Sequence, residues 1–345
     1  MDDTEFFQNL FQAVHESENQ SVQLLMIRIQ TLAWANSTLN SYLQVAKKFV
    51  DFIETNDCDP NCITEEVISV FLVRLAQSEL KISTISTLLS NLKGFYKFLH
   101  AKFPEQSYLD ITIKGLSRVC DTSVRRAEPV LSSHLAILEV CFTGIQLNSA
   151  AASYMRSILS DNKLRIMVMF TMAHDGLLRV SELLGLKWSD IMHTELGFVI
   201  SIGHSKTNQS GPPETVSIID HEAGYTSAST WLNIYEGKYA KDPDALMFPC
   251  LKKRQTSIST REFNKWVKLY AVQMQLDPKA VSSHSFRSGG ATDMVLRGAT
   301  REMVMRQGRW KSIEMVEIYF RPSTSAWQSF LRQNGTTRGT LQGGL

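Results

Sequence analysis

The sequence predicts a mainly α-helical protein with a small antiparallel β-sheet, built as an N-terminal helical domain and a C-terminal α+β domain that form two lobes. The chain has 345 residues, of which 43% are hydrophobic, so it exceeds the usual size of one domain and can bury ample core. Apolar residues recur at helical spacing through most of the chain. In the second half of the chain, one stretch alternates apolar and polar residues as strands do.

The first 120 residues are expected to be helical. Residues 1–35 indicate a helical preamble without catalytic content. Residues 36–120 are expected to form a compact domain of three helices. The first has Ser37 or Thr38 as its N-cap, the second begins after Thr64, and the third spans about 83–103.

A linker is expected at residues 121–130, because this segment has no helical stripe and contains Pro129. It also carries Arg125 and Arg126. Residues 131–333 are then expected to form the second domain, and residues 334–345 a disordered tail.

The second domain is expected to contain three short strands among its helices. The strands fall at 188–194, 197–205 and 214–220, separated by turn formers. Ser259, Thr300 and Ser312 are suited to N-caps, and Gly298 to a helix end. The helices are expected at about 224–236, 259–275, 284–297, 300–307, 312–319 and 324–333.

Several classes of protein are disfavoured by composition. The acidic start lacks the features of a signal peptide, and the most apolar window, IMVMFTMA, is too short to span a bilayer. A soluble, intracellular protein with no membrane partner is therefore expected. The five cysteines are scattered, without the spacing of a zinc site, and are expected to be free thiols: Cys58, Cys62, Cys120, Cys141 and Cys250.

The net charge of +2 conceals an asymmetry. Residues 1–130 carry 12 basic and 16 acidic residues, whereas residues 131–345 carry 24 and 18. From Leu251 onward there are 16 basic and 6 acidic residues, a surplus of 10. Such a surplus favours a polyanionic partner, although a merely soluble basic surface would look the same.

One set of residues indicates chemistry. The segment HSFR places His284 and Arg287 one helical turn apart, and GRW lies downstream with a tyrosine nine residues after its tryptophan. Two arginines, a lysine, a histidine and a tyrosine are suited to breaking and remaking a phosphodiester through a covalent protein intermediate. The candidate set is Arg179, Glu182, Lys206, His284, Arg287, Trp310 and Tyr319.

Each member has a structural alternative when taken singly. Arg179 and Glu182 could form a surface ion pair. Trp310 could anchor the core, and Tyr319 could pack on its own helix. The order and spacing of the whole set favour a shared site.

The segments GLLRVSELLGLKWSDI, HSFR and GRW with Tyr319 resemble, in order, the conserved boxes of the tyrosine recombinases, the phage-integrase family. The interval of 23 residues from Arg287 to Trp310 also agrees with that family. The match covers about 300 residues, with residues 36–120 similar to the core-binding domain. Trp310 stands where the family often has histidine and Cre-type recombinases have tryptophan.

The resemblance implies a site-specific recombinase that cuts and rejoins DNA strands. Tyr319 would attack the scissile phosphorus to give a 3′-phosphotyrosine, while Arg179 and Arg287 clamp the phosphate. Lys206 would protonate the leaving 5′-oxygen. His284 would hydrogen-bond the phosphate, Trp310 would donate its indole N–H to it, and Glu182 would orient one of these residues.

The resemblance also implies partners. Double-stranded DNA would be bound by a dimer at each site and by a tetramer in the synapse, without metal or nucleotide cofactor. The segment SAWQSFLRQ would dock on a neighbouring subunit or fold back on its own core. Residues expected to contact DNA are Lys93, Lys97, Arg125, Arg126, Lys252, Lys253 and Arg254, although Lys93 and Lys97 fit an ordinary solvated face equally well.

Two other functions stay open at this stage. A type IB topoisomerase uses similar tyrosine chemistry as a monomer, and a non-enzymatic DNA-binding protein could retain the fold. The HSFRSGGAT run also resembles recombinases of eukaryotic mobile elements. Bacterial cytoplasm and eukaryotic nucleus are therefore both open.

Overall fold

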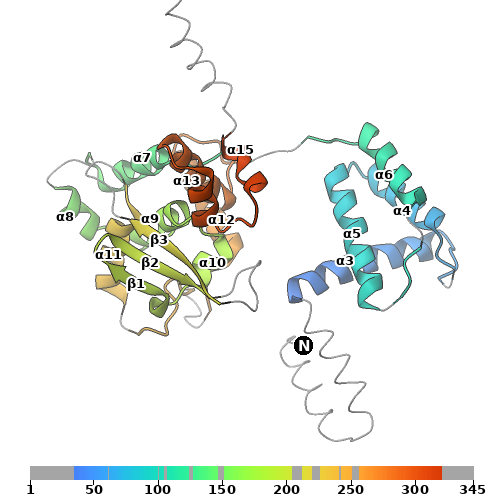
Figure 1. Cartoon of the computed structure of the whole chain (residues 1–345), viewed down its shortest axis with the longest axis horizontal. Coiled ribbons are helices and arrows are strands. Elements are labelled where there is room, and N and C mark those ends of the chain that lie inside the picture. Colours follow the sequence, from blue (N-terminus) through green and yellow to red (C-terminus); the bar gives the residue numbers. More distant parts are fainter. Residues whose placement is uncertain are drawn as a thin grey trace, which may run out of the picture. The chain divides into compact units, whose positions relative to one another are not determined.

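The computed structural model describes residues 35–60, 62–99, 101–104, 107–123, 127–146, 151–203, 212–219, 226–240, 242–250 and 256–320. The chain divides into two compact units, Met1–Arg125 and Arg126–Leu345. Both are visible in Figure 1.

Four helices form the described part of the first unit: α3 (Asn36–Thr55), α4 (Glu65–Gln77), α5 (Ile82–Phe98) and α6 (Ser107–Val119). Helix α3 packs on α5 and α4 packs on α6. Phe49 and Phe71 meet edge to face, with ring centroids 5.1 Å apart, inside a core closed by Ile68, Leu72 and Leu89. Aromatic pairs of this kind stabilise a small core beyond their buried area.

The helix starts agree only in part with expectation. Thr64 caps α4, because its hydroxyl accepts a hydrogen bond from the Val67 N–H. The expected cap of α3 at Ser37 or Thr38 is wrong: the helix begins at Asn36, and Ala35 holds the N-cap position with no side-chain bond. Helix α6 was not predicted, because Leu109, Ile111 and Ile113 alternate with polar residues as in a strand. In the helix itself, Ile111 is exposed.

The second unit begins before the expected linker ends. The Glu128 N–H donates to Ala280 O and the buried Val130 N–H donates to Ser285 O, at 2.8 and 2.9 Å. These residues therefore belong with the second unit. Arg125 and Arg126 lie outside the described residues.

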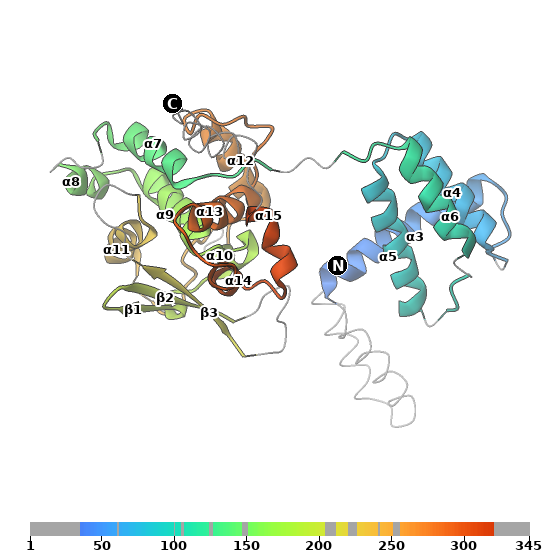
Figure 2. The same ribbon diagram turned by 45° about the horizontal axis from the view of Figure 1, so that its top comes forward.

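The second unit has helices on one side and a small sheet at one edge (Figures 1 and 2). Helix α9 runs through its middle and packs against α7, α10, α11 and α13. Every residue from Leu164 to His174 is buried. The helices before the sheet are α7 (Ser132–Thr143), α8 (Ala152–Ser157), α9 (Asp161–Asp175) and α10 (Val180–Gly185).

The expected three-stranded antiparallel sheet is confirmed, in the order β1-β2-β3. The strands are β1 (Ile191–Thr194), β2 (Gly197–Ile202) and β3 (Glu214–Ile219), with Ile200 paired to Val216. Strand β1 starts later than expected because Trp188–Asp190 forms a 3-10 turn, η1. The Lys187 N–H donates to the Asp190 carboxylate and closes that turn.

After the sheet come α11 (Ala228–Tyr239), α12 (Thr260–Ala271), α13 (His284–Leu296) and α14 (Arg301–Gly308). Ser259 and Thr300 cap α12 and α14 as expected, and Gly298 follows α13 with φ +88°. The single helix expected at 312–319 is wrong. A 3-10 turn, η2 (Ile313–Met315), and α15 (Glu317–Phe320) stand there, and Ser312 makes no side-chain bond to the N–H groups of η2.

Two glycines let α13 lie directly on its neighbours. A Cβ on Gly290 would come within 2.1 Å of His174 O, and one on Gly289 within 1.8 Å of Val130 O. Only glycine permits contacts this close without moving backbone. The SGG run therefore fixes the position of α13, and with it the position of Arg287.

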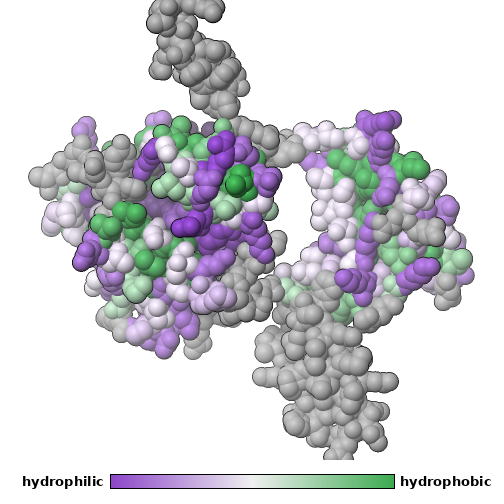
Figure 3. Space-filling view, viewed as in Figure 1, coloured by the Kyte–Doolittle hydropathy of each residue, from purple (hydrophilic) through white to green (hydrophobic). Residues whose placement is uncertain are grey.

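Hydrophilic residues gather on the face of the second unit that bears α10 and α13 (Figure 3). No helix among the described residues is long and apolar enough to cross a membrane.

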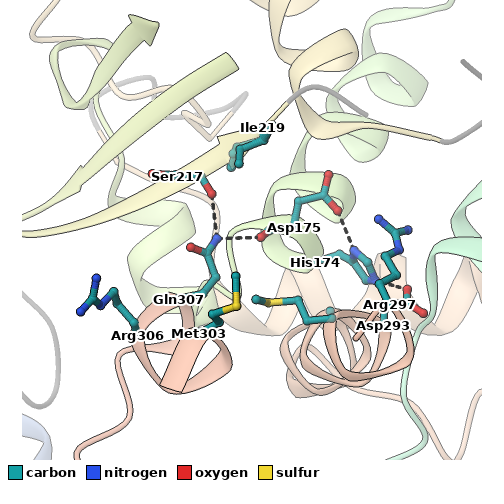
Figure 4. A pocket seen from close by; sticks show the side chains of 12 residues that line it. His174, Asp175, Ser217, Ile219, Asp293, Arg297, Met303, Arg306 and Gln307 are labelled. Atoms are coloured by element: carbon teal, nitrogen blue, oxygen red, sulfur yellow. Dashed lines mark hydrogen bonds and ion pairs between the residues drawn. The ribbon is translucent and has the colours of Figure 1, made fainter. Parts of the chain in front are cut away.

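A buried histidine joins four segments of this unit. Nδ1 and Nε2 of His174 lie 2.7 Å from Asp175 and 2.9 Å from Asp293, respectively (Figure 4). The two aspartates also accept hydrogen bonds from the Ala228 and Ser132 N–H groups. Burial alone would lower the pKa of His174, but the hydrogen bonds and charges of Asp175 and Asp293 raise it to about 9.

We expect His174 to make stability pH-dependent. Because its folded pKa exceeds the ordinary 6.5, its stabilisation is fully present below about pH 6.5 and is lost as pH rises through about 9. The difference corresponds to on the order of 3 kcal/mol of unfolding free energy. Urea unfolding of His174→Gln, followed by tryptophan fluorescence, should show a weaker decline between pH 6 and 10 than the wild type.

The matched control is His193→Gln. That histidine pairs with Glu236, but more than half of its side chain is exposed, so losing this ion pair should change the stability little. Equal declines in the wild type and His174→Gln would contradict the prediction.

Candidate active site

Arg287 is the most constrained residue of the candidate set. It is only 2% exposed, and its guanidinium donates hydrogen bonds to the backbone carbonyls of Leu177 and Gly308. Those carbonyls belong to the turn after α9 and to the end of α14. Its Cζ also lies 4.4 Å from the ring centroid of Trp310. Three segments thus hold one guanidinium.

Arg179 stands at the N-cap of α10, where Glu182 holds it at two points. Its N–H donates to Glu182 Oε2 at 2.8 Å, and its Nη1 lies 2.6 Å from Oε1. The expected i,i+3 pair is present, yet it is not a simple surface pair, because the Glu182 side chain is only 1% exposed. Arg179 keeps 24% of its side chain exposed. It can therefore offer a donor to a ligand while Glu182 holds its position.

Glu182 has a second arginine partner, Arg309. This residue is the arginine of the GRW motif, and no role was predicted for it from the sequence. Arg309 Nη2 lies 2.6 Å from Glu182 Oε2, and its side chain is 3% exposed. Burial raises the pKa of Glu182, but the charges of Arg309 and Arg179 and the hydrogen bonds from Arg179 outweigh it and hold that pKa below its ordinary value. The carboxylate is therefore ionised at neutral pH.

His284 begins α13, one turn before Arg287. Partial burial and the positive charges of Arg287 and Arg179 lower its pKa below the ordinary 6.5. The same electrostatic coupling joins the two arginines: burial, Arg179 and Arg309 lower the pKa of Arg287 to about 10. His284 is thus neutral at pH 7 and carries both a donor and an acceptor nitrogen.

Trp310 and Tyr319 pack on each other, with ring centroids 5.4 Å apart. Gly308 makes room for the indole, since a Cβ there would lie 1.8 Å from the Trp310 ring. A negative charge on Tyr319, present only when its hydroxyl is deprotonated, would raise the pKa of Arg287. Trp310 therefore contacts both Arg287 and Tyr319.

Contacts join five of the seven candidates in two groups, Arg179 with Glu182 and Arg287 with Trp310 and Tyr319. The groups meet at Leu177 O, which accepts hydrogen bonds from Arg287 and from Arg309, the second partner of Glu182. His284 joins them through its charge coupling to Arg287 and Arg179. Lys206 lies outside the described residues, in the segment between the end of β2 and the start of β3.

The structure describes only some of the residues expected to contact DNA. Lys97 on α5 is exposed, whereas Lys93 is half-buried with its ammonium 5.7 Å from the ring centroid of Phe103. This cation–π contact engages the Lys93 ammonium, which is then less available to a phosphate. Arg125, Arg126, Lys252, Lys253 and Arg254 lie outside the described residues.

A basic surface on α12 was not predicted from the sequence. Arg261, Lys265 and Lys268 are exposed at helical spacing, and Lys279 joins them around a hollow that also includes Ser282. The spacing of the three helical cations was the available signal. Because residue 282 directly precedes the turn into His284, this positive surface adjoins the chain that enters the site.

Within the described ranges, no three His, Cys, Asp or Glu side chains gather as metal ligands would. None of the described cysteines Cys58, Cys62, Cys120, Cys141 and Cys250 forms a disulfide bond.

Comparison with known proteins gives a family match. Residues 146–325, a range that spans all seven candidates, match the phage integrase family, and residues 29–102 match the phage integrase N-terminal SAM-like domain.

Individual relatives are distant. The integrase/recombinase xerD homolog of Selenomonas ruminantium is 24% identical over 312 residues, covering 87% of this chain and 86% of the relative. The recombinase cre of Escherichia phage P1 is 25% identical over 187 residues, covering 49% and 52%. A crystal structure of XerH site-specific recombinase bound to a palindromic difH substrate, in a post-cleavage complex, aligns with a TM-score of 0.59. It is 15% identical and covers 86% of this chain and 78% of that one.

We expect His284 to titrate below 6.5 in the free protein, because two guanidinium groups and partial burial disfavour its charged form. Replacing Arg179 with glutamine removes one positive charge and should raise the pKa of His284. Histidine side-chain NMR across pH 4.5–8.5 measures both values. His193 lies against Glu236 on strand β1 and serves as the internal control, because its resonances should be the same in the two proteins. If the pKa of His284 is the same in the wild type and in the Arg179 variant, the two side chains do not share a site.

Proposed function

The chain belongs to the phage integrase family and is a tyrosine recombinase, and we propose that it cuts and rejoins double-stranded DNA at specific sites through a 3′-phosphotyrosine on Tyr319. The observation that carries this proposal is the connected group of Arg179, Glu182, Arg287, Trp310 and Tyr319. In it the Tyr319 ring packs on Trp310, which packs on the buried Arg287 guanidinium, and Arg179 adds a second guanidinium that remains partly exposed. That arrangement matches the needs of phosphoryl transfer to a side-chain oxygen.

In the proposed first step, the Tyr319 oxygen forms a bond to the scissile phosphorus while the bond from phosphorus to the 5′-oxygen breaks. Negative charge develops on the non-bridging oxygens. Arg179 and Arg287 are fixed donors whose positions are set before the substrate arrives, so they stabilise this charge without reorganisation. The phenolic proton leaves as the bond forms, and neutral His284 can accept it directly or through the phosphate.

The departing 5′-oxygen needs a proton, and Lys206 is proposed as its donor. A single ammonium group on a connection between two strands has the reach and the acidity for this role. The Tyr319–phosphate linkage conserves the energy of the phosphodiester, so the reverse attack by a 5′-hydroxyl needs no nucleotide. The guanidinium charges do the work that a divalent cation performs in other phosphoryl transfers.

DNA binding is proposed for both units. The surplus of 10 positive charges after Leu251 and the α12 hollow suit a phosphate backbone. Lys97 and Lys93 on α5 would support residues 36–120 of the first unit as a core-binding domain. Further contacts would come from Arg125, Arg126, Lys252, Lys253 and Arg254. Action on DNA inside the cell follows, in bacterial cytoplasm or in a nucleus.

Assembly is proposed to direct the reversible reaction. Two dimers would pair two DNA sites as a tetramer, with the segment 324–333 of one subunit docking on its neighbour. A type IB topoisomerase is the alternative function that would use the same chemistry. It would relax supercoiled DNA without defined sites, whereas a recombinase requires pairing of two sites.

Tyr319→Phe should abolish covalent attachment, because it removes the attacking oxygen and preserves the ring that packs on Trp310. The measurement uses a nicked suicide substrate carrying the true recombination site, from which the short 5′-hydroxyl strand diffuses away. The wild type should accumulate a protein–DNA adduct that withstands denaturation.

Tyr270→Phe is the matched control, since that tyrosine packs on Phe142 in the core and should not affect the adduct. Wild-type protein that binds the substrate but leaves it intact would overturn the proposed function.

Lys206→Ala should slow cleavage by about 10²-fold or more, in the range typical of a lost general acid. A substrate with sulfur in place of the bridging 5′-oxygen has a leaving group that needs no proton. On that substrate the variant should cleave at nearly the wild-type rate. Single-turnover rates on the oxygen and sulfur substrates test the assignment. An equal loss on both would assign Lys206 to phosphate binding instead.

A further inference from the structure

Arg309 is a buried cation in a backbone conformation that arginine rarely adopts. It follows α14 with φ +53°, in the left-handed region where glycine usually ends a helix. The residue as a whole is 8% exposed. Holding a non-glycine residue there is unfavourable, and burying its charge is more so unless the charge is paired. The side chain must therefore make a specific compensating contact.

That contact is to Glu182, which Arg309 shares with Arg179. One carboxylate oxygen, Oε1, lies 2.6 Å from Arg179 Nη1, and the other, Oε2, lies 2.6 Å from Arg309 Nη2. Oε2 also accepts the Arg179 N–H. The carboxylate is thus a bridge between the two arginines, buried from solvent.

The charge balance explains what Arg309 contributes. If Glu182 faced Arg179 alone, the buried negative charge would draw the Arg179 guanidinium to itself and neutralise it. With Arg309 on the other side, the three side chains together carry one net positive charge. The exposed edge of Arg179 then remains available to a phosphate, while its position stays fixed.

Arg309 also reaches two other parts of the site. Its Nη2 lies 3.5 Å from Leu177 O, the carbonyl that Arg287 binds, and its Nε lies 3.7 Å from Glu214 Oε2. Glu214 is the first residue of β3, the strand that follows the segment with Lys206. The Arg309 guanidinium is engaged by Glu182, Leu177 O and Glu214, so we assign it no direct contact with the phosphate.

We infer that Arg309 is a positioning residue for strand cleavage: by sharing Glu182 it keeps Arg179 both fixed in place and electrostatically available to the scissile phosphate. The inference rests on the proposed function, since it concerns the same phosphate site. Arg309 acts only through Glu182 and Arg179. It is not a catalytic residue.

The test compares single-turnover cleavage by the wild type, Arg309→Gly and Arg179→Gln on two suicide substrates. One has the natural phosphate, and in the other a methyl group replaces a non-bridging oxygen of the scissile phosphate, which removes its charge. Glycine suits the left-handed conformation, so Arg309→Gly deletes the guanidinium without adding backbone strain. Arg309→Lys, which keeps the charge and loses the fork, is the second variant if Arg309→Gly fails to fold.

On the natural substrate Arg309→Gly should cleave at least 10-fold more slowly than the wild type, with unchanged DNA affinity. On the uncharged substrate this ratio should shrink toward one, in parallel with Arg179→Gln, because no negative charge then needs clamping. Adding Glu182→Gln to Arg309→Gly should recover part of the rate, since it removes the carboxylate that Arg309 compensated. Arg306→Met, which deletes an exposed cation of the same helix, is the control for charge loss and should cleave like the wild type.

An equal loss on both substrates would assign Arg309 a structural role and overturn the inference. Wild-type rates for both Arg309 variants on the natural phosphate would overturn it as well. If the wild type itself forms no adduct on that substrate, the proposed function fails first, so the two failures are distinguishable.

Discussion

The site depends on the burial of one guanidinium between two backbone carbonyls. Arg287 binds the turn after α9 through Leu177 O and the end of α14 through Gly308 O. A buried charge that is held by carbonyl dipoles loses much of its stabilisation if either carbonyl moves away. Both segments are therefore restricted to one geometry. Trp310 closes the third side, and Tyr319 packs on Trp310. The position of the proposed nucleophile is therefore set through Arg287.

Small residues make that burial possible. Gly289 and Gly290 allow α13 to contact the backbone at Val130 and His174, and Gly308 leaves space for the indole of Trp310. The His174 cluster ties the same end of α9 to α13 through Asp293. A packed interior tolerates little displacement, so these contacts restrict Arg287 in addition to its own two hydrogen bonds.

Local chemistry decided which features the sequence could predict. Thr64, Ser259 and Thr300 were found because a cap is a bond between near neighbours in the chain. The three strands were found from their alternation, and the catalytic candidates from their order and spacing. Helix α6 was missed because its apolar residues mimic a strand, and residues 312–319 broke into two turns where one helix was expected. Arg309 could not be assigned, because its partners Glu182 and Glu214 lie 127 and 95 positions away in the chain (309 − 182 and 309 − 214).

Electrostatics explains why a site for a phosphate contains a buried carboxylate. Arg179, Arg287 and Arg309 repel one another, and burial with this repulsion lowers the pKa of Arg287 to about 10. Without Glu182 the unliganded protein would have to hold three guanidinium groups together uncompensated. With it, Arg179 and Arg309 are anchored and the group still carries a surplus of positive charge. His284 stays neutral in the same field, so the incoming phosphate is met by charge from arginine alone, and the histidine remains able to exchange a proton.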